Sequence, residues 1–124
     1  MAEILVVDDD DMIRLTVRNI LSAVGHVVIE AANGLEALKI LAMKRPALII
    51  TDILMPEKEG IETILEIRRI FADIKIIAVS GGGRAHQMEF LDFAKQAGAD
   101  RILPKPFSGQ QLIAAINDLI SPGC

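Results

Sequence analysis

The sequence has a single cysteine, few aromatic residues and no long hydrophobic run. Cys124 is the last residue, which excludes a disulfide framework and a cysteine-based metal site. Tyr and Trp are both absent. No apolar stretch approaches the roughly 20 residues of a membrane-spanning helix, and the N-terminus lacks the basic-then-apolar layout of a signal peptide. We therefore expect a soluble, cytoplasmic protein with no membrane partner.

Positive charge is also sparse, because 13 Lys and Arg residues stand against 17 Asp and Glu residues and the net charge is −4. The basic residues are scattered, so nothing predicts a nucleic-acid-binding surface. Hydrophobic residues make up 52% of the 124 residues, which is typical of a globular chain with one core. We expect one domain, residues 1–124.

Two kinds of segment alternate along the chain. Short runs rich in Ile and Val are typical of buried parallel strands and fall at Ile4–Val7, Val27–Glu30, Ala47–Thr51, Ile74–Val79 and Arg101–Leu103. Apolar residues at helical spacing occur in Met12–Val24, Leu35–Lys44, Ile61–Phe71, Gln87–Ala97 and Gln110–Ile120. This alternation predicts an α/β fold, with a doubly wound, five-stranded parallel sheet of order 2-1-3-4-5 and five helices, which is the flavodoxin-like arrangement.

Polar residues follow four of the predicted strands. Asp8 and Asp9 come after the first strand, Asp52 after the third, Ser80 after the fourth and Lys105 after the fifth. Strands one and three are neighbours in the expected order, so the three carboxylates should converge on one pocket. Carboxylate oxygens suit Mg²⁺, whereas an ammonium and a hydroxyl suit a phosphoryl group. Together these residues fit phosphoryl transfer to an aspartate.

The four aspartates Asp8–Asp11 need not share one role. Asp11 stands just before the first apolar-periodic turn, so we expect it to be the N-cap of the helix. For Asp10 we expect only solvation or a favourable interaction with the helix dipole.

Four stretches, "ILVVDDDD", "IITDILMPEKEG", "IIAVSG" and "GADRILPKPF", resemble the receiver domain of two-component response regulators, in particular the single-domain chemotaxis regulators. The resemblance covers essentially the whole chain. It implies that Asp52 is the phosphoacceptor and that Asp9 ligates Mg²⁺ directly. Asp8 would act largely through water, and the backbone carbonyl of Leu54 would be a further ligand.

The resemblance also implies roles for residues near the end of the chain. Ser80 would be the switch hydroxyl, Lys105 the phosphate partner, and the Lys105–Pro106 bond would be cis. The phosphoryl donor would be a histidine kinase or a histidine phosphotransfer protein. A downstream protein would bind the face formed by the fourth helix, fifth strand and fifth helix. Such a domain is a signalling module and not an enzyme in the usual sense, although it can promote its own phosphorylation and dephosphorylation.

Some positions depart from the family pattern and keep alternatives open. Ile102 stands where many members have Tyr or Phe, so an aromatic side chain cannot swing there. A Mg²⁺-dependent phosphatase with an aspartyl-phosphate intermediate is one alternative, although Leu54 occupies the position of its general acid. A pseudo-receiver that binds partners without phosphorylation is another. A flavodoxin-like cofactor binder would place its phosphate beside the four aspartates, which would repel it.

Overall fold

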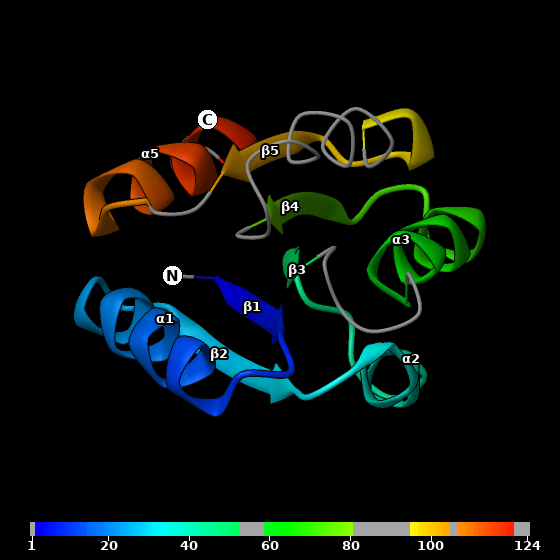
Figure 1. The fold of residues 1–124 in the computed structure, drawn as a ribbon, viewed down its shortest axis with the longest axis horizontal. Coiled ribbons are helices and arrows are strands. Elements are labelled where there is room, and N and C mark those ends of the chain that lie inside the picture. Colours follow the sequence, from blue (N-terminus) through cyan, green and yellow to red (C-terminus); the bar gives the residue numbers. More distant parts are fainter. Residues whose placement is uncertain (1, 53–58, 81–94, 105–106, 121–124) are drawn as a thin grey trace.

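The computed structural model describes residues 2–52, 59–80, 95–104 and 107–120, and element labels follow Figure 1. The strands are β1 (Glu3–Val7), β2 (Val27–Ala31), β3 (Leu48–Asp52), β4 (Lys75–Ser80) and β5 (Arg101–Pro104). The helices are α1 (Asp11–Ala23), α2 (Gly34–Leu41), α3 (Glu59–Ile70) and α5 (Gly109–Leu119). Of the helix predicted at Gln87–Ala97, residues 95–97 are helical, and residues 87–94 lie outside the described part.

The five strands form one parallel sheet in the order β2-β1-β3-β4-β5. This confirms the predicted strand order and fold class. Four strands, β2 to β5, end one residue later than expected, so Asp52 is the last residue of β3 and Ser80 is the last residue of β4. Both residues therefore belong to the sheet and not to the loops that follow it.

Helices cover both faces of the sheet, which explains why its central strands are almost entirely apolar (Figure 1). Side chains of alternate strand residues point to opposite faces, so Leu5 and Ile4 pack in different core clusters. One cluster joins the sheet to α2 and α3 and the other joins it to α1 and α5. Burial of each Leu or Ile side chain contributes about 1.5–3 kcal/mol, so these two layers hold the strand ends in place.

Within the described part of the chain, the helices are too short or too polar to cross a membrane.

Helix α1 begins one residue earlier than the sequence suggested. Asp10 is the N-cap, with an extended backbone (φ −94°, ψ 113°), and its carboxylate accepts hydrogen bonds from the N–H groups of Met12 (2.9 Å) and Ile13 (3.4 Å). Asp11 is instead the first helical residue and forms an ion pair with Arg14. The predicted N-cap at Asp11 and the merely solvated role for Asp10 were therefore wrong. The chain turns immediately after Asp8, which places Asp10 and not Asp11 at the point where the first helical N–H groups need an acceptor.

The C-terminal end of α3 is fastened to the strands beside it by one arginine. The Arg68 guanidinium donates to the carbonyl oxygens of Ile74 (2.9 Å) and Gly98 (2.8 Å) and pairs with the Asp100 carboxylate at 2.7 Å. Gly98 has φ +124°, and a Cβ added there would lie 2.9 Å from Cγ of Arg68. Only glycine therefore fits between this backbone conformation and the arginine stem.

We expect Gly98→Ala to lower the free energy of unfolding by about 2–3 kcal/mol, because backbone strain adds to the clash with Arg68. Gly25→Ala is the matched control, since Gly25 also has a positive φ of +90° but no atom within 4 Å of an added Cβ. Strain alone should cost this control about 1 kcal/mol. Urea denaturation measures both values, and equal losses would show that the Arg68 contact does not matter.

Replacement of the N-cap should cost more than replacement of its neighbour. Asp10→Ala should lower the free energy of unfolding by about 1 kcal/mol, because two helical N–H groups lose their acceptor. Asp11→Ala removes the same charge from the next position but breaks only an i,i+3 ion pair in which the Asp11 side chain is 87% exposed, so we expect a loss below about 0.5 kcal/mol. Chemical denaturation in EDTA compares the two variants, and a larger loss for Asp11→Ala would contradict the observed cap.

Candidate functional site

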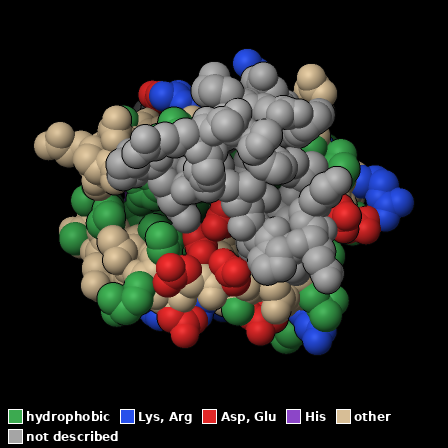
Figure 2. Space-filling view, viewed as in Figure 1, with side chains coloured by type: hydrophobic (Ala, Val, Ile, Leu, Met, Phe, Trp, Pro, Cys, Tyr) green, Lys and Arg blue, Asp and Glu red, His purple; other side chains and the backbone are tan. Residues whose placement is uncertain are grey.

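Three aspartates meet at the carboxyl ends of two neighbouring strands. One oxygen from each of Asp8, Asp9 and Asp52 lies within 4.8 Å of the other two. Asp8 directly follows β1, and Asp52 ends β3, whose Thr51 is aligned with Val7 of β1. The convergence predicted from the strand order is thus confirmed. Figure 2 shows acidic side chains gathered near the middle of one face, whereas the basic side chains visible there lie mostly at the margin.

Two of the three carboxylates are buried. Asp8 is 4% exposed and Asp52 is 7% exposed, whereas Asp9 is exposed. Two unit charges of the same sign at this separation repel by on the order of 3 kcal/mol at an effective dielectric constant of 20. The fold therefore holds negative charges together against their repulsion, and a bound cation would remove that cost.

Asp8 is fixed through three of its atoms. Its N–H donates to the Ala31 carbonyl at 3.1 Å and extends the β1–β2 ladder by one residue. Its Oδ1 accepts from the Asp10 N–H at 2.9 Å, and its carbonyl accepts from Nη1 of Arg14 at 2.5 Å. The direction of the Asp8 side chain is consequently set by the surrounding backbone before any ligand arrives.

Asp52 is fixed by the sheet itself. It lies in the central strand β3, where it is aligned with Val79 of β4, and the neighbouring Thr51 is fully buried. Because β3 is flanked by β1 and β4, the Asp52 carboxylate stands between the Asp8–Asp9 turn and the end of β4 that carries Ser80.

The donor set suits a hard divalent cation. All the candidate ligand atoms in the cluster are carboxylate oxygens, which Mg²⁺ prefers over nitrogen or sulfur. Three ionised carboxylates also carry more negative charge than is needed to neutralise one divalent cation. The residues present therefore fit the Mg²⁺ that the sequence resemblance implies.

Several predicted site residues are not placed by this structure. Leu54, Lys105 and Pro106 lie outside the described residues, so a carbonyl ligand, a phosphate-binding ammonium and a cis peptide bond all stay predictions. Ser80 is placed through its backbone only, at the end of β4 and aligned with Pro104 of β5.

Arg14 is a residue beside the site that the sequence did not single out. Its side chain is 13% exposed and bridges Asp11 and Glu30, with Nε donating to Glu30 at 3.1 Å. Burial acts to lower the pKa of Arg14, but its hydrogen bonds to the two carboxylates outweigh burial and raise it. The helical spacing of residues 12–24 concerns the apolar side chains only and carries no sign that Arg14 has a partner on β2.

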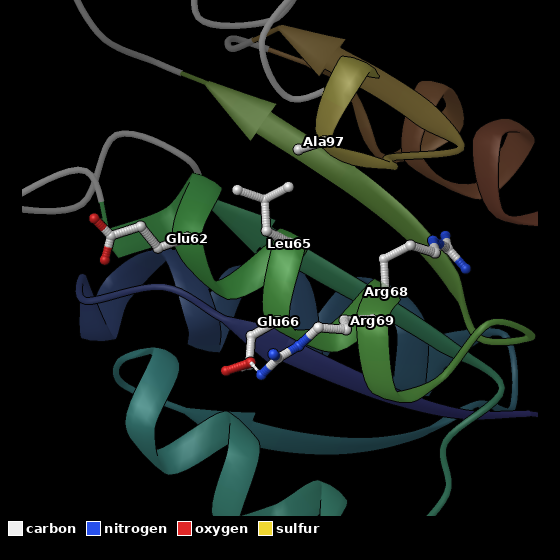
Figure 3. A pocket seen from close by; sticks show the side chains of 6 residues that line it. All are labelled: Glu62, Leu65, Glu66, Arg68, Arg69 and Ala97. Carbon is white, nitrogen blue, oxygen red and sulfur yellow. Dashed lines mark hydrogen bonds and ion pairs between the residues drawn. The ribbon is translucent and has the colours of Figure 1, made fainter.

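A separate groove lies along α3. Its lining residues are Glu62, Leu65, Glu66, Arg68, Arg69 and Ala97 (Figure 3). Arg69 pairs with Glu66 on the same helix, and Arg68 pairs with Asp100 at 2.7 Å. The two arginines of this groove are thus both paired with carboxylates.

Comparison with known proteins agrees with the geometry. The family model described as response regulator receiver domain matches residues 4–117. The response regulator MprA of Mycobacterium ulcerans (strain Agy99) is 36% identical over 118 residues, which are 94% of this chain and 49% of that protein. The chain thus spans about half the length of the curated relatives it matches.

Solved structures of similar length share the fold. The receiver domain of NtrX from Brucella abortus is 30% identical with a TM-score of 0.88, covering 97% of this chain and 99% of that one. A CheY-like receiver domain protein from Methanospirillum hungatei JF-1 is also 30% identical, with a TM-score of 0.86 and coverage of 95% and 92%. The family model matches residues 4–117, and the strand order and the clustered aspartates agree with it. We conclude that this chain belongs to the response regulator receiver domain family, the signalling domains of two-component systems.

Proposed function

We propose that this domain accepts a phosphoryl group on Asp52 from a phosphohistidine of a partner kinase or phosphotransfer protein. The observation that carries the proposal is the meeting of Asp8, Asp9 and Asp52 at the ends of β1 and β3. A carboxylate oxygen of Asp52 would attack phosphorus, and the P–N bond to histidine would break. The electron pair of that bond would leave with the imidazole, and an acyl phosphate would form.

Asp8, Asp9 and Asp52 would hold Mg²⁺, with the Leu54 carbonyl as a further ligand. Asp9 would bind directly, and the buried Asp8 would act largely through water. When bound, the ion would supply positive charge to offset the carboxylates and the phosphoryl oxygens. Asp8 is already hydrogen-bonded to the Asp10 N–H, so its side chain would need little reorganisation on binding.

Ser80 and Lys105 would bind the remaining phosphoryl oxygens. These roles are supported by the positions of the two residues in the chain. Ser80 is the last residue of β4, which lies next to β3, and Lys105 follows β5, which lies next to β4. The new charge on Asp52 would draw these two side chains inward and bias the neighbouring loops. The readout surface would be the fourth helix together with β5 and α5, where a downstream protein would bind. Residues 1–124 would act as one signalling domain and not as an enzyme that turns over a separate substrate.

The first test is covalent labelling with acetyl phosphate and Mg²⁺, read by intact-protein mass spectrometry. We expect one phosphoryl adduct, which should be lost in Asp52→Asn and when EDTA is added. Asp73→Asn is the matched control, because Asp73 is an exposed acid before β4, at the opposite end of the sheet. An adduct formed at full yield in Asp52→Asn would contradict the assignment, and steady turnover of a phosphomonoester would favour a phosphatase instead.

The second test is the thermal stability of the folded domain with and without Mg²⁺. The ion should raise the melting temperature, because it binds the assembled cluster and not the unfolded chain, by about 2.7 kcal/mol of stability at 100 times its Kd. Asp9→Ala should remove most of this gain, and the exposed position of Asp9 means that the fold tolerates the change. Asp73→Ala removes an equal charge from an exposed position at the opposite end of the sheet and should leave the response intact; a normal Mg²⁺ response in Asp9→Ala would rule out that ligand.

A further inference from the structure

Arg14 connects three elements around the aspartate cluster. Its Nη1 donates to the Asp8 carbonyl at 2.5 Å, its Nε donates to Glu30 Oε1 at 3.1 Å, and its Nη2 pairs with Asp11. Arg14 belongs to α1, Asp8 follows β1, and Glu30 lies on β2, where it is aligned with Val6. One guanidinium therefore ties the end of the first strand to its neighbouring strand and to the helix after it.

The bond to the Asp8 carbonyl has a consequence for Asp9. That carbonyl belongs to the planar peptide group that joins Asp8 to Asp9, so holding it restricts the rotation of the whole plane. The plane sets the direction in which the exposed Asp9 side chain leaves the backbone. The orientations of both side chains are thereby restricted: that of Asp8 by its own hydrogen bonds, and that of Asp9 by the peptide group that joins it to Asp8.

We infer that Arg14 is a positioning residue for the cation site: it holds the Asp8–Asp9 peptide so that both carboxylates face Asp52. This inference rests on the proposed function, in which the cluster binds Mg²⁺. A guanidinium suits the task because its donors form a rigid planar fork that can reach a carbonyl and two carboxylates at once. A lysine ammonium would keep the charge but lose the fork.

Charge and positioning predict opposite effects of removing Arg14. A positive group beside the cluster repels a cation, so loss of its charge alone should tighten Mg²⁺ binding. Loss of positioning should weaken binding, because the two aspartates would have to be ordered when the ion arrives. Whether the Kd for Mg²⁺ falls or rises when Arg14 is replaced therefore distinguishes the two roles, whatever the size of the change.

The experiment is a calorimetric Mg²⁺ titration of the whole chain and of three variants. We expect Arg14→Gln and Arg14→Lys each to raise the Kd for Mg²⁺ about tenfold, as is common when a group that orients a metal ligand is lost. Arg18→Gln is the matched control, because Arg18 lies on the same helix and pairs with the other oxygen of Glu30 at 2.5 Å. Its Kd should change by less than about twofold, as expected for an exposed ion pair.

Amide hydrogen exchange without Mg²⁺ supplies a readout that does not depend on the ion. The Asp10 N–H, which donates to Asp8 Oδ1, should exchange faster in both Arg14 variants and at the usual rate in Arg18→Gln. If Arg14→Gln does not fold, Arg14→Lys and Glu30→Gln carry the same comparison.

Two results would overturn the inference: unchanged or tighter Mg²⁺ binding in the folded Arg14 variants, or an Asp10 exchange rate equal to that of the unaltered chain. Absence of Mg²⁺ binding by the unaltered chain would count against the proposed function instead, and is seen before any variant is compared.

Discussion

The repulsion among Asp8, Asp9 and Asp52 is a free-energy cost that the packing of the sheet has to offset. These carboxylates meet because β1 lies next to β3, although the two strands are separated in the sequence by β2 and two helices. The two apolar layers on either face of the sheet supply the free energy that holds the strand ends together. The core thus stabilises the close approach of these like-charged side chains, and under the proposed function a bound cation would relieve their repulsion.

Two arginines fasten the loops at opposite ends of the sheet. Arg14 binds the Asp8 carbonyl where β1 ends, and Arg68 binds the Gly98 and Ile74 carbonyls where β5 and β4 begin. Each satisfies backbone oxygens that lie outside the regular ladder and pairs with an acid from another element. The apolar layers fix the strands, and these two guanidinium groups extend that order into the turns. Of these two turns, the one at Asp8 borders the aspartate cluster, which is why we assign Arg14 a role in the cation site and Arg68 a role in stability.

The sequence was enough to predict the strand order and the convergence of the aspartates, because Ile- and Val-rich runs alternating with amphipathic stretches permit few topologies. It failed where neighbouring residues were chemically identical or where the partner was distant in the chain. Asp10 and Asp11 offer the same carboxylate, and only the path of the backbone after Asp8 decides which one caps α1. Arg14 was not singled out, because its partner Glu30 comes from β2 and the two residues meet only through tertiary packing.

Ile102 restricts the ways in which phosphorylation of Asp52 could change the structure of the proposed readout face. It is aligned with Ala78 of β4 and packs against the core layer that contains α2 and α3 residues. A β-branched side chain is restricted at χ1, so a partly buried isoleucine has little freedom to change rotamer. Under the proposed function, charge on Asp52 must therefore act on the readout face through small shifts of the β4 and β5 strand ends and not through rotation of an aromatic ring. The Arg68 contacts lie at the amino ends of the same strands, so under the proposed function they would hold those ends in place while the carboxyl ends beside Asp52 shift.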